Sequence, residues 1–275
     1  MASSAGVWPK SLALVGAGKM GGAMLRGWLA GGLAPGAVAI LDPAPAPDIV
    51  ALAAARGLAL TPPSGMKPEV LILAVKPQML DTAATAIAAL AHEDALVISI
   101  IAGKTIANLK ARAPKARAFV RAMPNTPAAI GRGVTGAAAN DALSERQKDM
   151  ARTLLSTVGI FDWLPDESFI DAVTALSGSG PAYVFALVEA MAAAGEALGL
   201  PSDLAMRFAR GTVEGAGELL AREPETPAAQ LRQNVTSPAG TTAAALKVLQ
   251  SPDGLDRLVR EAIAAAHKRA GELAG

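Results

Sequence analysis

The sequence contains no cysteine, which excludes disulfides, thiol nucleophiles and cysteine-ligated metal sites. Aromatic residues make up only 3% of the chain although 52% is hydrophobic, so its core must consist mainly of Ala, Val, Leu and Ile. Only two histidines occur, His92 and His267, and neither lies in a motif for a Ser-His-Asp hydrolase or a metal site. Hydrolysis and metal chemistry are therefore disfavoured, and we assign no metal ligand.

Neither sign of charge dominates, since 25 basic and 24 acidic residues give a net charge of +1. Without a basic run, neither nucleic acid nor a membrane surface is an expected partner. The longest uncharged run, residues 172–188, is interrupted by Gly-Ser-Gly-Pro, and the N-terminus lacks the apolar region of a signal peptide. We expect a cytoplasmic protein.

Apolar runs alternate with helical patterns over the first 160 residues, which indicates a doubly wound α/β domain with a parallel sheet. The predicted strands cover residues 11–16, 37–42, 69–75, 95–101, 115–122, 135–140 and 157–164. The predicted helices between them cover residues 19–31, 47–56, 77–91, 105–112 and 143–156.

From Glu167 onward the strand signals stop, and the pattern predicts only helices, at about 167–176, 181–199, 202–222, 227–233, 241–250 and 253–273. We place the boundary near Pro165, with domains 1–165 and 166–275. The helix at 181–199 is apolar or small around most of its circumference, which is typical of a helix buried on all sides. About 110 residues make a thin domain for such a helix, so we expect a homodimer built mainly on residues 167–275.

A G-x-G-x-x-G motif, GAGKMG at residues 16–21, joins the first predicted strand to the first helix. Gly16 permits a tight turn, Gly18 permits close approach to a pyrophosphate, and Gly21 permits close packing of helix on strand. The free amides at the start of the helix favour phosphate binding. The alternative is a glycine-rich turn that binds nothing.

The second strand ends at Asp42, 21 residues after Gly21, where a carboxylate can accept hydrogen bonds from an adenosine ribose. No Arg or Lys follows until Arg56, so we expect NADH to be tolerated better than NADPH. The alternative is that Asp42 simply opens a turn with Pro43.

Three further stretches, AVKPQ (74–78), IAGKT (101–105) and RAMPNTPAAIGRG (121–133), end strands at the same sheet edge, where ligands of such folds bind. In the helical half, NVTSPAGTT (234–242) lies between two helices and has no acid, base or histidine. Gly240 and Thr241 precede or begin a helix there, so free amides and hydroxyls suit an anion such as a carboxylate. Each stretch is alternatively an ordinary loop or cap.

These motifs together resemble the pyrroline-5-carboxylate reductase family. The similar segments, over about residues 12–250, are GAGKMGGAML, LAVKPQ, SIIAGKTIANL, RAMPNTP, DAVTALSGSGPAYVF and NVTSPAGTTAAALKVL. The resemblance implies a Rossmann domain followed by an all-α dimerisation domain. It also implies NAD(P)H-dependent reduction of 1-pyrroline-5-carboxylate to L-proline, the last step of proline biosynthesis, by a dimer. Whether the dimers assemble further into a larger ring is left open by the sequence.

The resemblance also implies site residues. Dinucleotide contacts are expected at Gly16, Ala17, Gly18, Lys19, Met20, Gly21, Ala74, Val75, Lys76, Pro77, Ala102, Gly103, Asn125, Pro127 and Asn234. Contacts to the imine or proline are expected at Glu167, Thr241 and Thr242, with Glu225 and Ser237 nearby. The residues themselves lead us to expect the carboxylate at the amides and hydroxyls from Gly240 to Thr242. We expect Thr242, or a water, to relay a proton to the substrate nitrogen.

Two positions depart from the family's pattern. Asp42 stands where many members have Ser, Asn or Arg, which puts the usual NADPH preference in doubt. The family's SPGG is here Ser237-Pro238-Ala239-Gly240, and we expect Ala239 to adopt a φ that alanine tolerates.

Two other functions fit a dinucleotide domain joined to helices. A β-hydroxyacid dehydrogenase would need a lysine in the helical half, where Lys247 is the only one between Trp163 and Val259 and lies outside a G-x-x-K motif. A dinucleotide sensor would bind the cofactor without turnover.

Overall fold

A computed structural model describes residues 6–274. Contacts divide the chain into two compact units, which are described separately. The first unit comprises the chain up to Gly178 together with the stretch from His267 onward, and the second comprises Ser179–Ala266. The two units divide after Gly178. The domain boundary expected near Pro165 lies earlier, just after the last strand of the sheet, and it stays a prediction.

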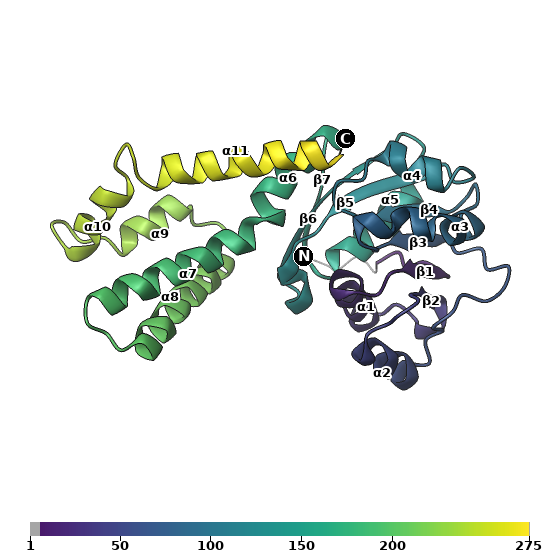
Figure 1. Ribbon diagram of the computed structural model, residues 1–275, viewed down its shortest axis with the longest axis horizontal. Coiled ribbons are helices and arrows are strands. Elements are labelled where there is room, and N and C mark those ends of the chain that lie inside the picture. The colour runs from purple at the N-terminus through teal and green to yellow at the C-terminus, as the bar shows by residue number, and fades with distance from the viewer. Residues whose placement is uncertain (1–5, 275) are drawn as a thin grey trace. The chain divides into compact units, whose positions relative to one another are not determined.

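The first unit contains a seven-stranded sheet in the order β2-β1-β3-β4-β5-β6-β7 (Figure 1). Strands β1 to β5 are parallel, β6 is antiparallel to β5, and β7 is parallel to β6. All seven strands were predicted at these places, but the reversal at β6 was not. The strands are β1 (Leu12–Val15), β2 (Val38–Leu41), β3 (Val70–Leu73), β4 (Leu96–Ser99), β5 (Ala118–Met123), β6 (Gly133–Ala139) and β7 (Gly159–Trp163).

The helices of this unit begin and end close to the predicted positions. They are α1 (Lys19–Gly31), α2 (Pro47–Arg56), α3 (Leu80–Leu90), α4 (Ile106–Arg112), α5 (Glu145–Ser156) and α6 (Ile170–Val173). Short 3-10 turns are η1 (Pro35–Ala37), η2 (Pro77–Met79), η3 (Thr126–Ile130) and η4 (Glu167–Phe169), and η5 (Thr174–Gly178) is a π-helical turn. Capping boxes begin α4 and α5, because Thr105 pairs with Asn108 and Ser144 with Gln147.

Alternating side chains of the buried strands divide the core into two layers. On one face of the sheet, Leu14 and Ile40 pack in one cluster with Trp28 of α1 and Leu154 of α5. On the other face, Leu73 packs with residues of α3 and α4. Strands covered on both faces explain why the sequence shows nearly continuous apolar runs rather than alternation.

The second unit is helical. Helices α7 (Gly180–Ala197) and α8 (Ser202–Arg222) pack against each other as a hairpin (Figure 1). They are followed by α9 (Ala228–Asn234), α10 (Thr241–Leu249) and α11 (Leu255–Ala274), whose last residues belong to the first unit. Within residues 6–274, no helix is both long enough and apolar enough to cross a membrane.

Candidate active site

The glycine-rich loop lies between β1 and α1, where two of its three glycines are required by the chain itself. Gly16 has φ +90°, and a Cβ there would lie 2.8 Å from the Ala74 carbonyl oxygen. A Cβ at Gly21 would lie 2.3 Å from the Gly16 oxygen. These positions confirm the tight turn and the close packing predicted for Gly16 and Gly21.

Gly18 differs, because no heavy atom lies within 4 Å of the place where its Cβ would be. Its φ of −67° is one that any residue can adopt, and no side chain caps the N-terminus of α1 beside it. The fold therefore does not require glycine here. An uncapped helix N-terminus next to a bare backbone fits a pyrophosphate group.

This loop borders a cleft of about 760 Å³ at the carboxyl ends of β1 and β3. The sheet order changes direction there, since β2 lies on one side of β1 and β3 on the other, and ligands of open α/β sheets bind at such a point. Nine of the expected dinucleotide residues line it: Ala17, Gly18, Lys19, Met20, Ala74, Val75, Lys76, Pro77 and Ala102.

Asp42, at the end of β2, is half-buried and is hydrogen-bonded to the glycine-rich loop. Its Oδ2 accepts the Ala17 N–H at 2.8 Å, and its Oδ1 accepts the Ala44 N–H at 3.0 Å. Asp42 thus opens a turn, as the alternative interpretation held, and also holds the loop. An ionised carboxylate has about four acceptor positions, so its oxygens retain capacity for a ribose hydroxyl.

Arg26 lines the same cleft. It was not predicted there, because it belongs to α1, whereas the expectation about a basic residue concerned only the segment after β2. Its guanidinium forms an ion pair with Asp48 at the start of α2 and donates a hydrogen bond to the Gly22 carbonyl. Asp48 therefore partly neutralises the cation at the edge of the cleft.

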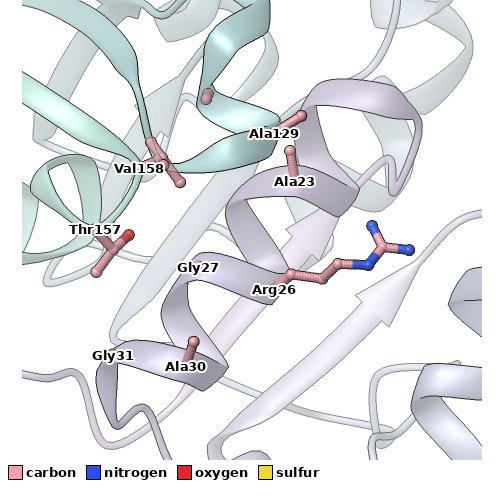
Figure 2. A pocket seen from close by; sticks show the side chains of 10 residues that line it. Ala23, Arg26, Gly27, Ala30, Gly31, Ala129, Thr157 and Val158 are labelled. Carbon is pink, nitrogen blue, oxygen red and sulfur yellow. The ribbon is translucent and has the colours of Figure 1, made fainter. Parts of the chain in front are cut away.

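A second cleft of about 450 Å³ lies along another side of α1 and is lined mainly by small residues (Figure 2). Figure 2 shows Arg26 directed away from Thr157 and Val158. The glycines beside those two residues allow close packing, because a Cβ at Gly27 would lie 2.7 Å from Val158 Cγ1. With little polar lining, this cleft results from helix packing and offers a nucleotide few partners.

Two expected site residues of the first unit have side chains that are hydrogen-bonded within the chain. Asn125, which is buried, donates to the Ser177 carbonyl at 3.0 Å and accepts the Val134 N–H at 2.8 Å. Glu167 accepts the Ile106 N–H and a hydrogen bond from Arg121.

The other expected substrate residues lie in the second unit. Gly240 is the N-cap of α10, and a Cβ there would lie 2.4 Å from the Ser237 hydroxyl oxygen. The amides of its first turn, which begins with Thr241 and Thr242, have no intrahelical acceptor, and no side chain caps the helix. Glu225 is exposed between α8 and α9, and the Asn234 carboxamide oxygen accepts from Gln230.

Comparison with known proteins places this architecture in one family. A family model described as pyrroline-5-carboxylate reductase dimerisation matches residues 167–273, and one described as NADP oxidoreductase, coenzyme F420-dependent, matches residues 11–103. The pyrroline-5-carboxylate reductase of Pseudomonas aeruginosa is 41% identical over 96% of both chains. The chain belongs to the pyrroline-5-carboxylate reductase family.

Solved structures agree with this membership. A pyrroline-5-carboxylate reductase from Coxiella burnetii has a TM-score of 0.87 and 35% identity, over 97% of this chain and 99% of that one. The pyrroline carboxylate reductase of Plasmodium falciparum, solved with NADP bound, has a TM-score of 0.77 and 26% identity, over 96% and 98%. The protein is therefore an oxidoreductase that uses a pyridine nucleotide, and its C-terminal helices are a region of self-association.

The prediction for the backbone of Ala239 is wrong. Ala239 has φ +57°, the only positive value among non-glycine residues in the described part of the chain. We had expected a φ that alanine tolerates. The turn between α9 and α10 instead keeps the left-handed backbone that glycine adopts without strain, although alanine stands there.

Proposed function

We propose that the protein reduces 1-pyrroline-5-carboxylate to L-proline, the last step of proline biosynthesis, with NADH or NADPH. The observation that carries the dinucleotide half of this proposal is the unobstructed backbone at Gly18 above the cleft. The substrate follows from the name shared by relatives that match 96% of the chain.

The domains and site residues expected from the sequence are part of the proposal. Residues 1–165 form the dinucleotide domain and 166–275 the dimerisation and substrate domain. The dinucleotide is held by Gly16, Ala17, Gly18, Lys19, Met20, Gly21, Asp42, Ala74, Val75, Lys76, Pro77, Ala102, Gly103, Asn125, Pro127 and Asn234. The nine residues that line the cleft support this assignment.

The substrate carboxylate is held at the N-terminus of α10, from Gly240 to Thr242, by backbone amides and the hydroxyls of the two threonines, with Ser237 beside them. Glu167 and Glu225 complete the substrate contacts. The uncapped first turn of α10 supports this, because a helix N-terminus favours an anion.

When bound, the reduced nicotinamide supplies the hydride that the imine carbon receives. The protein's main task is then to orient a protonated, already electrophilic imine. The proton on the imine nitrogen is taken up before the hydride arrives. A threonine hydroxyl is a poor acid, so Thr242 passes this proton from a solvent water to the nitrogen rather than releasing its own.

Thr242→Ala tests the proton relay. The variant should lower kcat by about tenfold or more, because general acid catalysis contributes factors of this size. Thr241→Ala is the comparison variant, since its hydroxyl is placed at the substrate carboxylate but not in the relay; it should raise the KM for the imine and leave kcat within about threefold of wild type. Values of kcat and KM within about threefold of wild type in Thr242→Ala would remove this role from Thr242.

For the cofactor, we propose that NADH is accepted at least as well as NADPH. A ribose bound at Asp42 would bring its 2′-phosphate beside a carboxylate that already carries negative charge. Arg26, the arginine that lines the cleft, is already paired with Asp48. Asp42→Asn should therefore lower the NADPH KM more than the NADH KM. Equal changes would contradict the proposed role of Asp42.

A homodimer, its assembly into a larger ring and a cytoplasmic location belong to the same proposal.

The decisive assay follows absorbance at 340 nm with 1-pyrroline-5-carboxylate and each dinucleotide in turn. Imine-dependent oxidation of the dinucleotide is the expected result. Binding without turnover would instead indicate a sensor, and turnover only with a hydroxyacid and oxidised dinucleotide would indicate a hydroxyacid dehydrogenase.

A further inference from the structure

A buried arginine joins β5 to the helical segment that follows β7. Arg121 is only 4% exposed, and its Nη1 donates to Glu167 Oε1 at 3.1 Å while its Nη2 donates to Asp171 Oδ1 at 3.4 Å. The two acids are four residues apart in the η4–α6 segment, so their side chains lie on one side and repel each other. The guanidinium offsets this repulsion and thereby sets the position of Glu167.

The same oxygen of Glu167 accepts a second hydrogen bond. Ile106, the first residue of α4, donates its N–H to Glu167 Oε1 at 2.8 Å. This amide has no acceptor within its own helix, and a carboxylate is a favourable partner at a helix N-terminus. Glu167 therefore connects the start of α4 to Arg121 on β5.

The four residues before Ile106 lead directly to the dinucleotide cleft. Ala102 lines that cleft. Gly103 has φ +67°, and a Cβ there would lie 2.9 Å from the Leu273 carbonyl oxygen, so this residue is packed against the last turn of α11. Thr105 caps α4. The loop from Ala102 to Thr105 is thus held at Gly103, at its cap and at the Ile106 amide.

We propose that Arg121 is a positioning residue for dinucleotide binding: by holding Glu167 against the Ile106 amide, it fixes the loop that begins at Ala102. The inference rests on the proposed role of Ala102 and Gly103 in holding the dinucleotide. Glu167 is also a proposed substrate contact. The Arg121 guanidinium therefore positions both the loop that binds the dinucleotide and a side chain that contacts the imine.

Arg121→Lys is the primary test. Lysine keeps the charge but has no planar fork, so it cannot hold both carboxylates in this geometry. The dissociation constant of NADH or NADPH, measured without imine by quenching of nicotinamide fluorescence, should rise by about tenfold. The KM for the dinucleotide should rise by the same factor, and the KM for the imine should rise too because Glu167 is a proposed substrate contact, while kcat at saturating concentrations of both changes by less than about threefold.

Arg112→Lys is the matched control, because Arg112 pairs with Asp81 at the other end of α4. It should leave the dissociation constant within about twofold of wild type. Exchange of the Ile106 amide hydrogen should accelerate in Arg121→Lys and remain unchanged in Arg112→Lys. A purely structural arginine would change unfolding without changing dinucleotide affinity.

The proposal is overturned if folded Arg121→Lys binds the dinucleotide like wild type, or if Arg112→Lys loses the same affinity. If Arg121→Lys does not fold, Glu167→Gln replaces it. Glutamine keeps an acceptor for the Ile106 N–H but loses the negative charge with which Arg121 pairs. A smaller loss of affinity is expected, and no loss overturns the proposal. Binding is measured without imine, so a wrong substrate assignment leaves this test valid, whereas wild-type protein that binds neither dinucleotide overturns both proposals.

Discussion

The two units of the chain differ in which side chains they bury. In the first unit, Trp28 and Phe119 are fully buried among Leu, Ile and Val side chains. In the second unit, the buried apolar residues among those described are the alanines Ala192, Ala205 and Ala209, while Phe185 is 63% exposed and Phe208 59%.

This difference has an energetic consequence. Burial of a large apolar side chain stabilises a fold by about 1.5–3 kcal/mol, and an alanine contributes much less. Ordering one residue costs about 1–2 kcal/mol of backbone entropy, so three buried alanines cannot stabilise a helical unit of this size. The second unit therefore needs another copy to cover its apolar side chains, whereas the first unit contains its own core.

The largest effect is expected from charges on the exposed apolar surface of the second unit. Phe185→Glu combined with Phe208→Glu would place two carboxylates where we expect the partner, and burying unpaired charges is prohibitive. Light scattering should show loss of self-association, circular dichroism should show loss of helix, and activity should fall by about a hundredfold or more.

The matched control, Phe185→Leu with Phe208→Leu, keeps most of the apolar area and should still self-associate. If the double glutamate variant retained its assembly and its helices, the contrast between the two units would not reflect an interface.

The next effect concerns the first unit, where the glycines of one loop have different roles. Gly18→Ala should leave the unfolding temperature unchanged, because space for a Cβ exists, yet it should weaken dinucleotide binding by about tenfold, or ~1.4 kcal/mol. Gly21→Ala should lower stability instead, since its Cβ would meet the Gly16 oxygen. Titration calorimetry and thermal unfolding separate the two results, and a Gly18→Ala protein with undiminished affinity would contradict a phosphate contact there.

A smaller effect is expected in the second unit at Ala239. Ala239→Gly removes a left-handed strain of about 1–2 kcal/mol and adds unfolded-state entropy, for a net gain of up to about 1 kcal/mol. Ala243→Gly, inside α10, should have the opposite sign, since glycine in a helix costs about 1 kcal/mol. Urea unfolding measures both, and a less stable Ala239→Gly protein would show that the turn compensates its strain.

The smallest effect is expected at Glu69, at the start of β3. Partial burial raises the pKa of this carboxyl, but the Lys10 N–H and the Arg146 guanidinium outweigh burial and hold the pKa below its ordinary value. Stability from this lowered pKa is present above the unfolded-state pKa and is lost as the pH falls through the folded-state pKa. Glu69→Gln should therefore cost about 0.5–1 kcal/mol at neutral pH and less in acid.

The prediction is checked by urea unfolding of wild type and Glu69→Gln, at two protein concentrations, from neutral pH down to acid pH. The difference should not depend on concentration, because Glu69 belongs to the unit with its own core. A difference that grew as the pH fell would contradict the direction of the pKa shift.

Much of the fold could be predicted from the sequence, because it depends on local patterns. The limits of α1 and α2 and the positions of all seven strands follow from periodicity, glycines and prolines. The direction of β6 could not be predicted, since a strand's apolar pattern is the same in either orientation. The φ of Ala239 was also missed, because alanine gives no local signal for a left-handed backbone.

The site divides in the same way. The roles of Gly16 and Gly21 follow from a short motif with a known backbone requirement. The place of Arg26 could not be predicted, because this residue reaches the cleft from α1 and is distant in the chain from the segment that follows β2.

By itself, the sequence determined the order of elements, the glycine-rich loop and the similarity to one reductase family, since each depends on residues close together in the chain. Tertiary structure alone decided which groups meet over long separations, such as Ala17 with Asp42 and Arg121 with Glu167. The physical reason is that hydrogen bonds and ion pairs depend on distance in space, and folding, not chain order, sets that distance.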